Sequence, residues 1–113
     1  MRLWGIWAMV ALLVLCSCGN RNKVKTPEVL LTEEQMIDVL TDSYLIEAEL
    51  NQMKSSGKDV QNLQAAYYEQ LFEHYGITDS IFSQNLAYYT YQPPVLERIM
   101  DSVTNRFEKY RNQ

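Results

Sequence analysis

Apolar residues recur every three or four positions along most of the chain after residue 32, which is the spacing of one face of an α-helix. Turn-forming residues divide this stretch, so we predict four helices, over residues 33–54, 60–75, 79–92 and 95–111. No segment alternates polar and apolar residues with the period of two that marks a strand. The pattern therefore predicts an all-α fold, a single compact domain of about four amphipathic helices with a small core.

Local signals set the ends of the first two predicted helices. Thr32 followed by Gln35 is a capping box, and Ser55-Ser56-Gly57 ends the first helix. Asp59 is the expected N-cap of the second helix, and Gly76 is its C-terminal stop.

The last two helices have equally local signals. Thr78 is the expected cap of the third helix, with Ile77 and Phe82 at the positions of a hydrophobic staple. Pro93-Pro94 ends this helix and prepares the first turn of the next. We expect one buried face on the last helix, which comprises Val95, Leu96, Ile99, Met100, Val103, Phe107 and Tyr110.

The N-terminus has the three parts of a secretory signal: basic Arg2, the apolar residues 3–15, and small residues after them. A membrane-spanning helix needs about 20 apolar residues, whereas this run meets the polar residues 19–23 after 16 residues. We predict a cleaved signal peptide over residues 1–17. An uncleaved signal anchor is the alternative.

The signal ends in Leu15-Cys16-Ser17-Cys18, which resembles the lipobox of bacterial lipoproteins. That motif has a large aliphatic residue three positions before the modified cysteine and a small residue directly before it, so Cys18 fits and Cys16 does not. The resemblance implies lipid attachment at Cys18, and several acyl chains anchor a protein firmly. Cleavage there leaves 96 of the 113 residues with a single, lipidated cysteine. We therefore expect no disulfide, thiolate metal site or cysteine nucleophile.

The segment after Cys18 is polar, contains Pro27 and has no periodicity, so we predict a flexible linker over residues 18–31 and a helical domain over residues 32–113. Loss of Arg2 with the signal changes the formal net charge from −4 to −5, which predicts no nucleic-acid partner. Three basic residues near the anchor, Arg21, Lys23 and Lys25, are a local exception to this negative charge. They either belong to a solvated linker or contact anionic lipid headgroups.

Three polar residues interrupt the apolar face of the first helix. Ser43, Glu47 and Asn51 are spaced four apart and form a ridge in the middle of Met36, Val39, Leu40, Tyr44, Ile46, Leu50 and Met53. An unpaired buried charge costs several kcal/mol, so Glu47 must be hydrogen-bonded, paired or protonated. One interpretation is a buried network satisfied by tyrosine hydroxyls or Arg106. The other is a groove that contacts a ligand or a partner.

His74, the only histidine, lies at the edge of the apolar face of the second helix. Without a cysteine or a second histidine nearby it is a poor metal signal, so we expect a half-buried packing residue, no metal and no cofactor. Six of the eight tyrosines lie on the second and third helices, and most are expected to pack with their hydroxyls in water. Tyr91 lies off the apolar face of its helix, so we expect it to be exposed and to be a candidate interface residue.

Several short segments, each weak alone, occur in a fairly specific order: residues 34–40, Glu47-Ala48, residues 75–78 with Phe82, Tyr88-Tyr89, and residues 94–103. Together they resemble a family of small Bacteroidota lipoproteins whose domain, DUF4296, has no known function. The resemblance implies an all-helical domain behind a lipobox. It implies no activity, cofactor or catalytic residue.

The residues after Cys18 lack both the aspartate of many lipoproteins retained at the inner membrane and the acidic run associated with surface display in Bacteroidota. By this analogy the expected location is the periplasmic face of the outer membrane. We therefore predict a lipid-anchored binding or adaptor module, not an enzyme, with a protein partner in the cell envelope. The alternatives are a carrier of an apolar ligand or lipid and, with less support, an enzyme that uses Glu47 and His74.

Overall fold

The computed structural model describes residues 25–113, which form four α-helices and no β-strand. The helices are α2 (Glu33–Ser55), α3 (Gln61–His74), α4 (Asp79–Thr90) and α5 (Pro93–Arg111). The prediction of an all-α domain with four helices is confirmed. The predicted signal peptide, the lipidated Cys18 and most of the linker lie outside the described residues.

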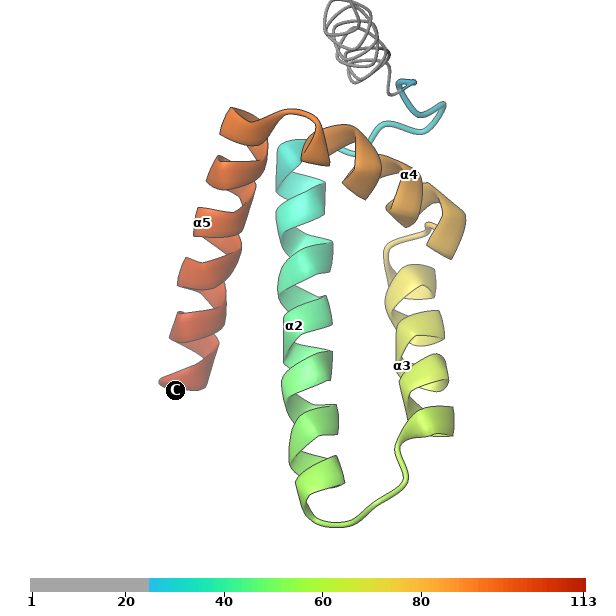
Figure 1. Cartoon of the computed structure of the whole chain (residues 1–113), viewed down its shortest axis with the longest axis vertical. Helices are drawn as coiled ribbons and strands as arrows, with labels where there is room; N and C mark the ends of the chain where they lie inside the picture. Colours follow the sequence, from blue (N-terminus) through green and yellow to red (C-terminus); the bar gives the residue numbers. More distant parts are fainter. Residues whose placement is uncertain (1–24) are drawn as a thin grey trace, which may run out of the picture.

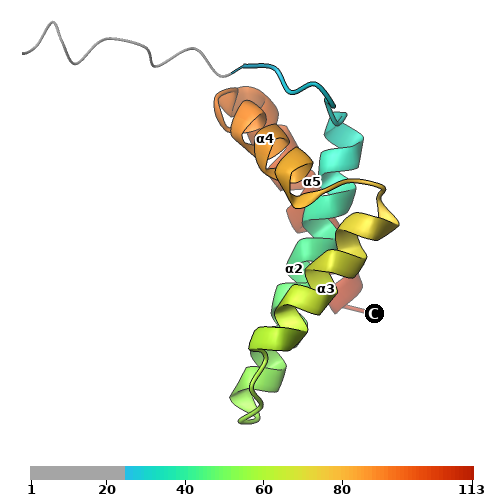
Figure 2. The same ribbon diagram turned by 90° about the vertical axis from the view of Figure 1, so that its right-hand side faces the viewer.

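Three of the helices lie side by side, with α2 between α5 and α3 (Figure 1). In the view from the side, α3, α2 and α5 stand one behind the other, so they form a single layer (Figure 2). The fourth helix, α4, crosses one end of this layer and packs on α5. The helices therefore do not surround a central core along their whole length, and α3 packs mainly on α2.

Two threonine caps form as predicted. The Thr32 hydroxyl oxygen accepts a hydrogen bond from the Gln35 backbone N–H at 3.1 Å, and the Gln35 side chain accepts from the Thr32 N–H at 2.8 Å. At α4 the Thr78 hydroxyl oxygen accepts from the Ile81 N–H at 3.1 Å. Both caps satisfy backbone donors that have no partner inside a helix.

The predicted cap of α3 needs a correction, because α3 begins at Gln61 with Val60 as its N-cap and no side-chain cap bond. Asp59 instead bonds to the Gln61 N–H at 3.2 Å, one residue outside the cap position. The helix ends as predicted before Gly76, whose φ of 67° lies in the left-handed region that favours glycine.

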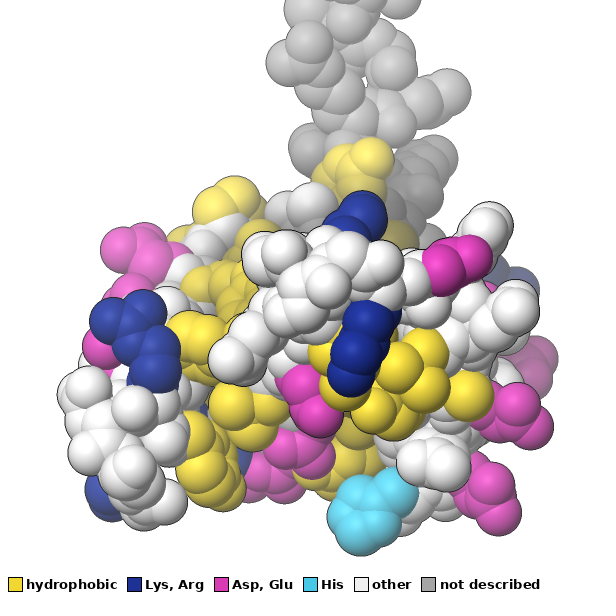
Figure 3. Space-filling model, turned by 90° about the horizontal axis from the view of Figure 1, so that it is seen from below, with side chains coloured by type: hydrophobic (Ala, Val, Ile, Leu, Met, Phe, Trp, Pro, Cys, Tyr) yellow, Lys and Arg dark blue, Asp and Glu magenta, His cyan; other side chains and the backbone are white. Residues whose placement is uncertain are grey.

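The main core lies where α4 crosses α2 and α5. It consists of Leu31, Met36, Ile37, Leu40, Tyr89, Ile99 and Val103. Two residues predicted on buried faces are exposed instead: Tyr44 retains 41% and Tyr110 55% of its accessible surface. Both lie away from α4, and a single layer leaves the edges of an apolar face in water. Figure 3, which looks at the lower end of the layer, accordingly shows hydrophobic side chains at the surface among charged ones.

The end of the predicted linker is part of the folded domain. Pro27 and Leu31 are buried, and fully buried Asn85 of α4 accepts a hydrogen bond from the Leu31 N–H and donates to the Val29 carbonyl, both at 2.8 Å. The Tyr89 hydroxyl donates to the Leu31 carbonyl. These bonds involve backbone groups of a non-helical segment, which helical periodicity does not detect. The packed domain thus begins before residue 32.

Candidate functional site

The polar ridge of α2 is shorter in the structure than the sequence predicts. Ser43 is buried and Glu47 is half-buried, but Asn51 is exposed. The Glu47 carboxylate accepts hydrogen bonds from the Tyr68 hydroxyl at 2.6 Å and from the Gln64 amide at 3.4 Å. A tyrosine hydroxyl on α3 therefore supplies a hydrogen bond to the half-buried Glu47 carboxylate.

Arg106, the other partner considered for Glu47, lies elsewhere. Its guanidinium forms ion pairs with Glu34 and Asp38 on the side of α2 that faces α5. Glu47 is therefore held by neutral donors and not by a cation.

A second bond between a tyrosine and a carboxylate joins α3 to α2, because the Tyr75 hydroxyl donates to Asp42. Burial and the bond to Glu47 raise the pKa of Tyr68 to about 12. Burial and the hydrogen bond to Asp42 likewise raise the pKa of Tyr75 above its ordinary value. Both hydroxyls consequently remain protonated donors above pH 10, where an ordinary tyrosine ionises.

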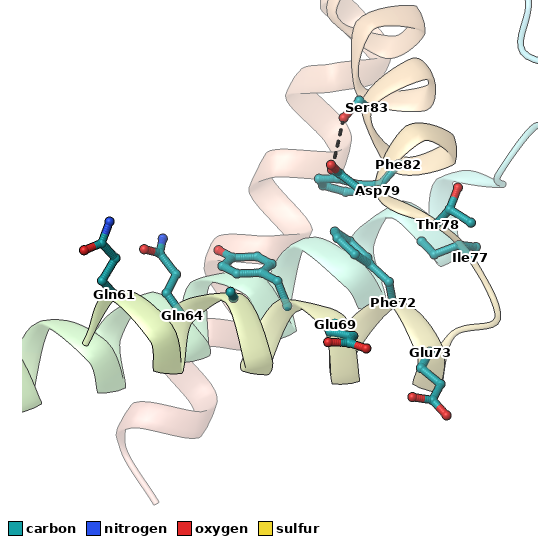
Figure 4. A pocket seen from close by; sticks show the side chains of 12 residues that line it. Gln61, Gln64, Glu69, Phe72, Glu73, Ile77, Thr78, Asp79, Phe82 and Ser83 are labelled. Atoms are coloured by element: carbon teal, nitrogen blue, oxygen red, sulfur yellow. Dashed lines mark hydrogen bonds between the residues drawn. The ribbon is translucent and has the colours of Figure 1, made fainter. Parts of the chain in front are cut away.

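An open groove of about 910 Å³ lies between α3 and the start of α4 (Figure 4). Its lining comes from one face of α3 and from the turn into α4: Gln61, Gln64, Ala65, Tyr68, Glu69, Phe72, Glu73, Ile77, Thr78, Asp79, Phe82 and Ser83. The Tyr68 hydroxyl that bonds to Glu47 thus belongs to a ring that lines this groove.

Three half-buried aromatic rings form the floor of the groove. The Tyr68 and Phe72 centroids are 6.0 Å apart, and the Phe72 and Phe82 centroids are 5.5 Å apart. Tyr68 and Phe72 share a helix face because they are four residues apart. The Thr78 cap starts α4 so that Phe82, in its first turn, meets Phe72. The floor is thus an apolar aromatic surface that water still reaches.

The rim of the groove is acidic. Glu69, Glu73 and Asp79 are exposed along it, and its lining residues include no lysine, arginine or histidine. The Asp79 carboxylate accepts a bond from the Ser83 hydroxyl at 3.4 Å. Within residues 25–113 the ion pairs involve Glu33, Glu34 and Asp38 and none of the rim carboxylates.

His74 does not have the half-buried environment predicted for it. It is exposed, as the cyan side chain in Figure 3 shows, and its ring meets Tyr75 edge-on with centroids 4.9 Å apart. It lines a second groove of about 590 Å³ between α2 and α3, together with Asp42 and Glu49. Glu47 lines neither of the two grooves beside α3, whereas His74 lines the second one, so these two grooves do not bring the residues of the enzyme alternative together.

Tyr91, at the C-terminal end of α4, is 60% exposed. It does not line either groove beside α3, and its role in an interface stays a prediction. Sequence reasoning overlooked Phe72 and Phe82 as site residues. The signal was available, since Tyr68 and Phe72 share a helix face and Phe82 was expected at a staple position.

The model of one protein family, Domain of unknown function (DUF4296), matches residues 27–113. The chain belongs to this family. The DUF4296 match begins at Pro27, in agreement with the packing of the residues before α2 onto α4. It also includes both grooves beside α3.

No curated protein and no solved structure matches the chain. Among the residues that the structure describes, no helix is long and apolar enough to cross a membrane. Likewise, residues 25–113 contain no group of three or more histidine, cysteine, aspartate or glutamate side chains arranged to hold a metal ion.

Proposed function

We propose that this DUF4296 protein is a binding or adaptor module of the cell envelope, tethered by a lipid on Cys18 to the periplasmic face of the outer membrane. The observation that carries the binding function is the aromatic groove between α3 and α4. Binding energy at protein surfaces concentrates in aromatic side chains that a partner can desolvate. Tyr68, Phe72 and Phe82 form such a surface, already fixed in place by their neighbours.

The tether rests on the sequence alone. The lipobox-like Leu15-Cys16-Ser17-Cys18 and the polar residues that follow support lipid attachment at Cys18. A lipid anchor confines the groove to one membrane surface, where a module without an activity of its own can hold a partner.

A photo-crosslinking residue at position 65 tests the binding function in living cells. Ala65 is exposed and lines the groove, so we expect a discrete covalent adduct with an envelope protein. Thr104, exposed on α5 and outside the groove, is the matched control and should give no such adduct. No adduct from position 65, or equal adducts from both positions, would contradict the proposal.

Further experiments test the tether, the location of the interface and the carrier alternative separately. Cys18→Ala should release the protein from the membrane and reduce the adduct from position 65. If only position 91 gives an adduct, the interface lies at Tyr91 and not in the groove. If native mass spectrometry instead finds a co-purified lipid or other apolar ligand that fills the groove, the protein is a carrier.

A further inference from the structure

We propose that the groove between α3 and α4 receives a positively charged amphipathic peptide segment of another protein. In this complex the apolar side chains of the segment contact the aromatic floor, and its lysine or arginine side chains contact the acidic rim. The inference rests on the proposed binding function and adds the chemical class of the partner.

The aromatic floor of the groove favours an occupant with apolar side chains. Three aromatic rings lie along it, and Ile77 adds an aliphatic side chain where the chain turns into α4 (Figure 4). These four side chains are only half-buried, so a partner can still remove apolar surface from water there. This burial would supply the affinity.

The acidic rim of the groove favours an occupant that carries positive charge. Glu69 and Glu73 lie four residues apart, so they share one edge of α3, and Asp79 stands in the first turn of α4. All three are exposed, and the lining contains no cation that could neutralise them. A cleft lined by charges of one sign attracts ligands of the opposite sign and excludes like charges. The rim would therefore supply selectivity for a cationic segment.

The same charges disfavour two other occupants. In a symmetric dimer formed through this groove, the two acidic rims would face each other and repel. A lipid with an anionic headgroup would bring negative charge to the same carboxylates. A basic peptide segment satisfies both the floor and the rim.

Peptide binding to the full lipidated protein in phosphatidylcholine nanodiscs tests the inference. Three labelled helical peptides serve as probes: one with a leucine face and lysines at its polar positions, one with glutamates in place of the lysines, and one with the lysine composition but a scrambled order. We expect the first to bind, with an affinity that falls as salt screens the rim. Empty nanodiscs correct for binding to lipid.

Two triple variants with the same charge change locate the binding site. Glu69→Gln/Glu73→Gln/Asp79→Asn removes the rim, and we expect about ten-fold weaker binding of the lysine peptide, since three exposed ion pairs contribute modestly each. Glu97→Gln/Asp101→Asn/Glu108→Gln removes three exposed carboxylates of α5 outside the groove. This control should bind the peptide almost as tightly as wild type. Circular dichroism confirms that both variants are folded.

Equal binding of the lysine and glutamate peptides, or equal losses in both triple variants, would overturn the inference. Equal binding of the ordered and scrambled lysine peptides would also overturn it, because the floor would then contribute nothing. A concentration-dependent dimer that becomes stronger in the rim variant would also overturn the inference, because a second copy of the chain would then occupy the groove. If position 65 forms its adduct in cells while the lysine peptide has no advantage, the binding function stands and the cationic partner is wrong.

Discussion

Asn85 shows how much one buried polar side chain can organise. It donates both amide hydrogens, to the carbonyls of Val29 and Ile81, and accepts from the Leu31 N–H. Within the described part of the chain, every buried side-chain nitrogen or oxygen has a hydrogen-bond partner. Asn85 thereby fixes the segment before α2 against α4, and nothing in its sequence context distinguishes it from the other polar residues of that helix.

We expect Asn85→Leu, which keeps a similar volume, to lower the free energy of unfolding by about 1–3 kcal/mol, because it leaves the buried N–H of Leu31 without a partner and removes the bond to the part-buried carbonyl of Val29. Urea unfolding measures the effect. Gln84→Leu, at an exposed neighbouring position, is the control and should change stability by about 0.5 kcal/mol or less. An Asn85→Leu variant as stable as wild type would show that these bonds do not hold the segment.

The two neighbours of α2 are attached by different chemistry. On the α5 side, Arg98 pairs with Glu33 at 3.0 Å, and Arg106 pairs with two further carboxylates. These ion pairs are substantially exposed, so each contributes little to stability. On the α3 side, Tyr68 and Tyr75 donate neutral hydroxyls to carboxylates. Of these two attachments, that of α3 is the one that should weaken when tyrosine ionises.

Tyr68→Phe tests this at alkaline pH. The folded pKa of Tyr68, about 12, exceeds its ordinary value of 10, so ionisation favours the unfolded chain. The contribution of Tyr68 is present below pH 10 and lost as the pH rises through about 12. We expect wild type to lose more stability than Tyr68→Phe in this window, as measured by urea unfolding with tyrosinate absorbance.

Tyr91→Phe, which changes an exposed tyrosine, should follow the wild-type pH dependence and serves as the control. If Tyr68→Phe and wild type instead lose stability in parallel, then the hydrogen bond to Glu47 does not resist ionisation of the Tyr68 hydroxyl. Because burial also raises the pKa values of Tyr75 and Tyr89, Tyr68→Phe should retain part of the alkaline loss.

The elements that sequence predicts here are those with local causes. A capping box, a glycine that needs positive φ and a pair of prolines act within a few residues, so α2, the end of α3 and α5 are found close to their predicted bounds. The exposure of Asn51 depends instead on where the neighbouring helix α3 begins. Gln64, in the first turn of α3, already bonds to Glu47, so the turn of α2 that contains Asn51 extends beyond α3.

At the scale of the whole molecule, sequence periodicity indicates that each helix has an apolar face but not which helices cover it. The single layer formed by α5, α2 and α3 follows from pairwise packing that no local signal encodes. One consequence is uneven burial, since Leu71 is the only buried residue of α3, whereas seven residues of α2 are buried. The aromatic groove exists because α3 is covered on one side only.

We therefore expect α3 to open without unfolding of the rest of the domain. Helices with few buried apolar contacts open at lower free energy, and their amide hydrogens exchange faster. Hydrogen–deuterium exchange followed by mass spectrometry should show faster exchange in residues 61–74 than in the middle of α2 and in α5. A common exchange rate for all four helices of the described region would show instead that the domain opens only as a unit.

The hydrogen bonds that Asn85 makes to residues 29 and 31 also fix the length of chain left for a tether. With the anchor that we propose at Cys18 and a packed domain from residue 27, eight residues, 19–26, separate the anchor from the domain. Eight residues reach at most about 29 Å. So short a tether would confine the groove to a thin layer beside the membrane, which raises its local concentration toward a partner in the same membrane. A groove of modest intrinsic affinity would then be occupied more often than the same groove free in solution.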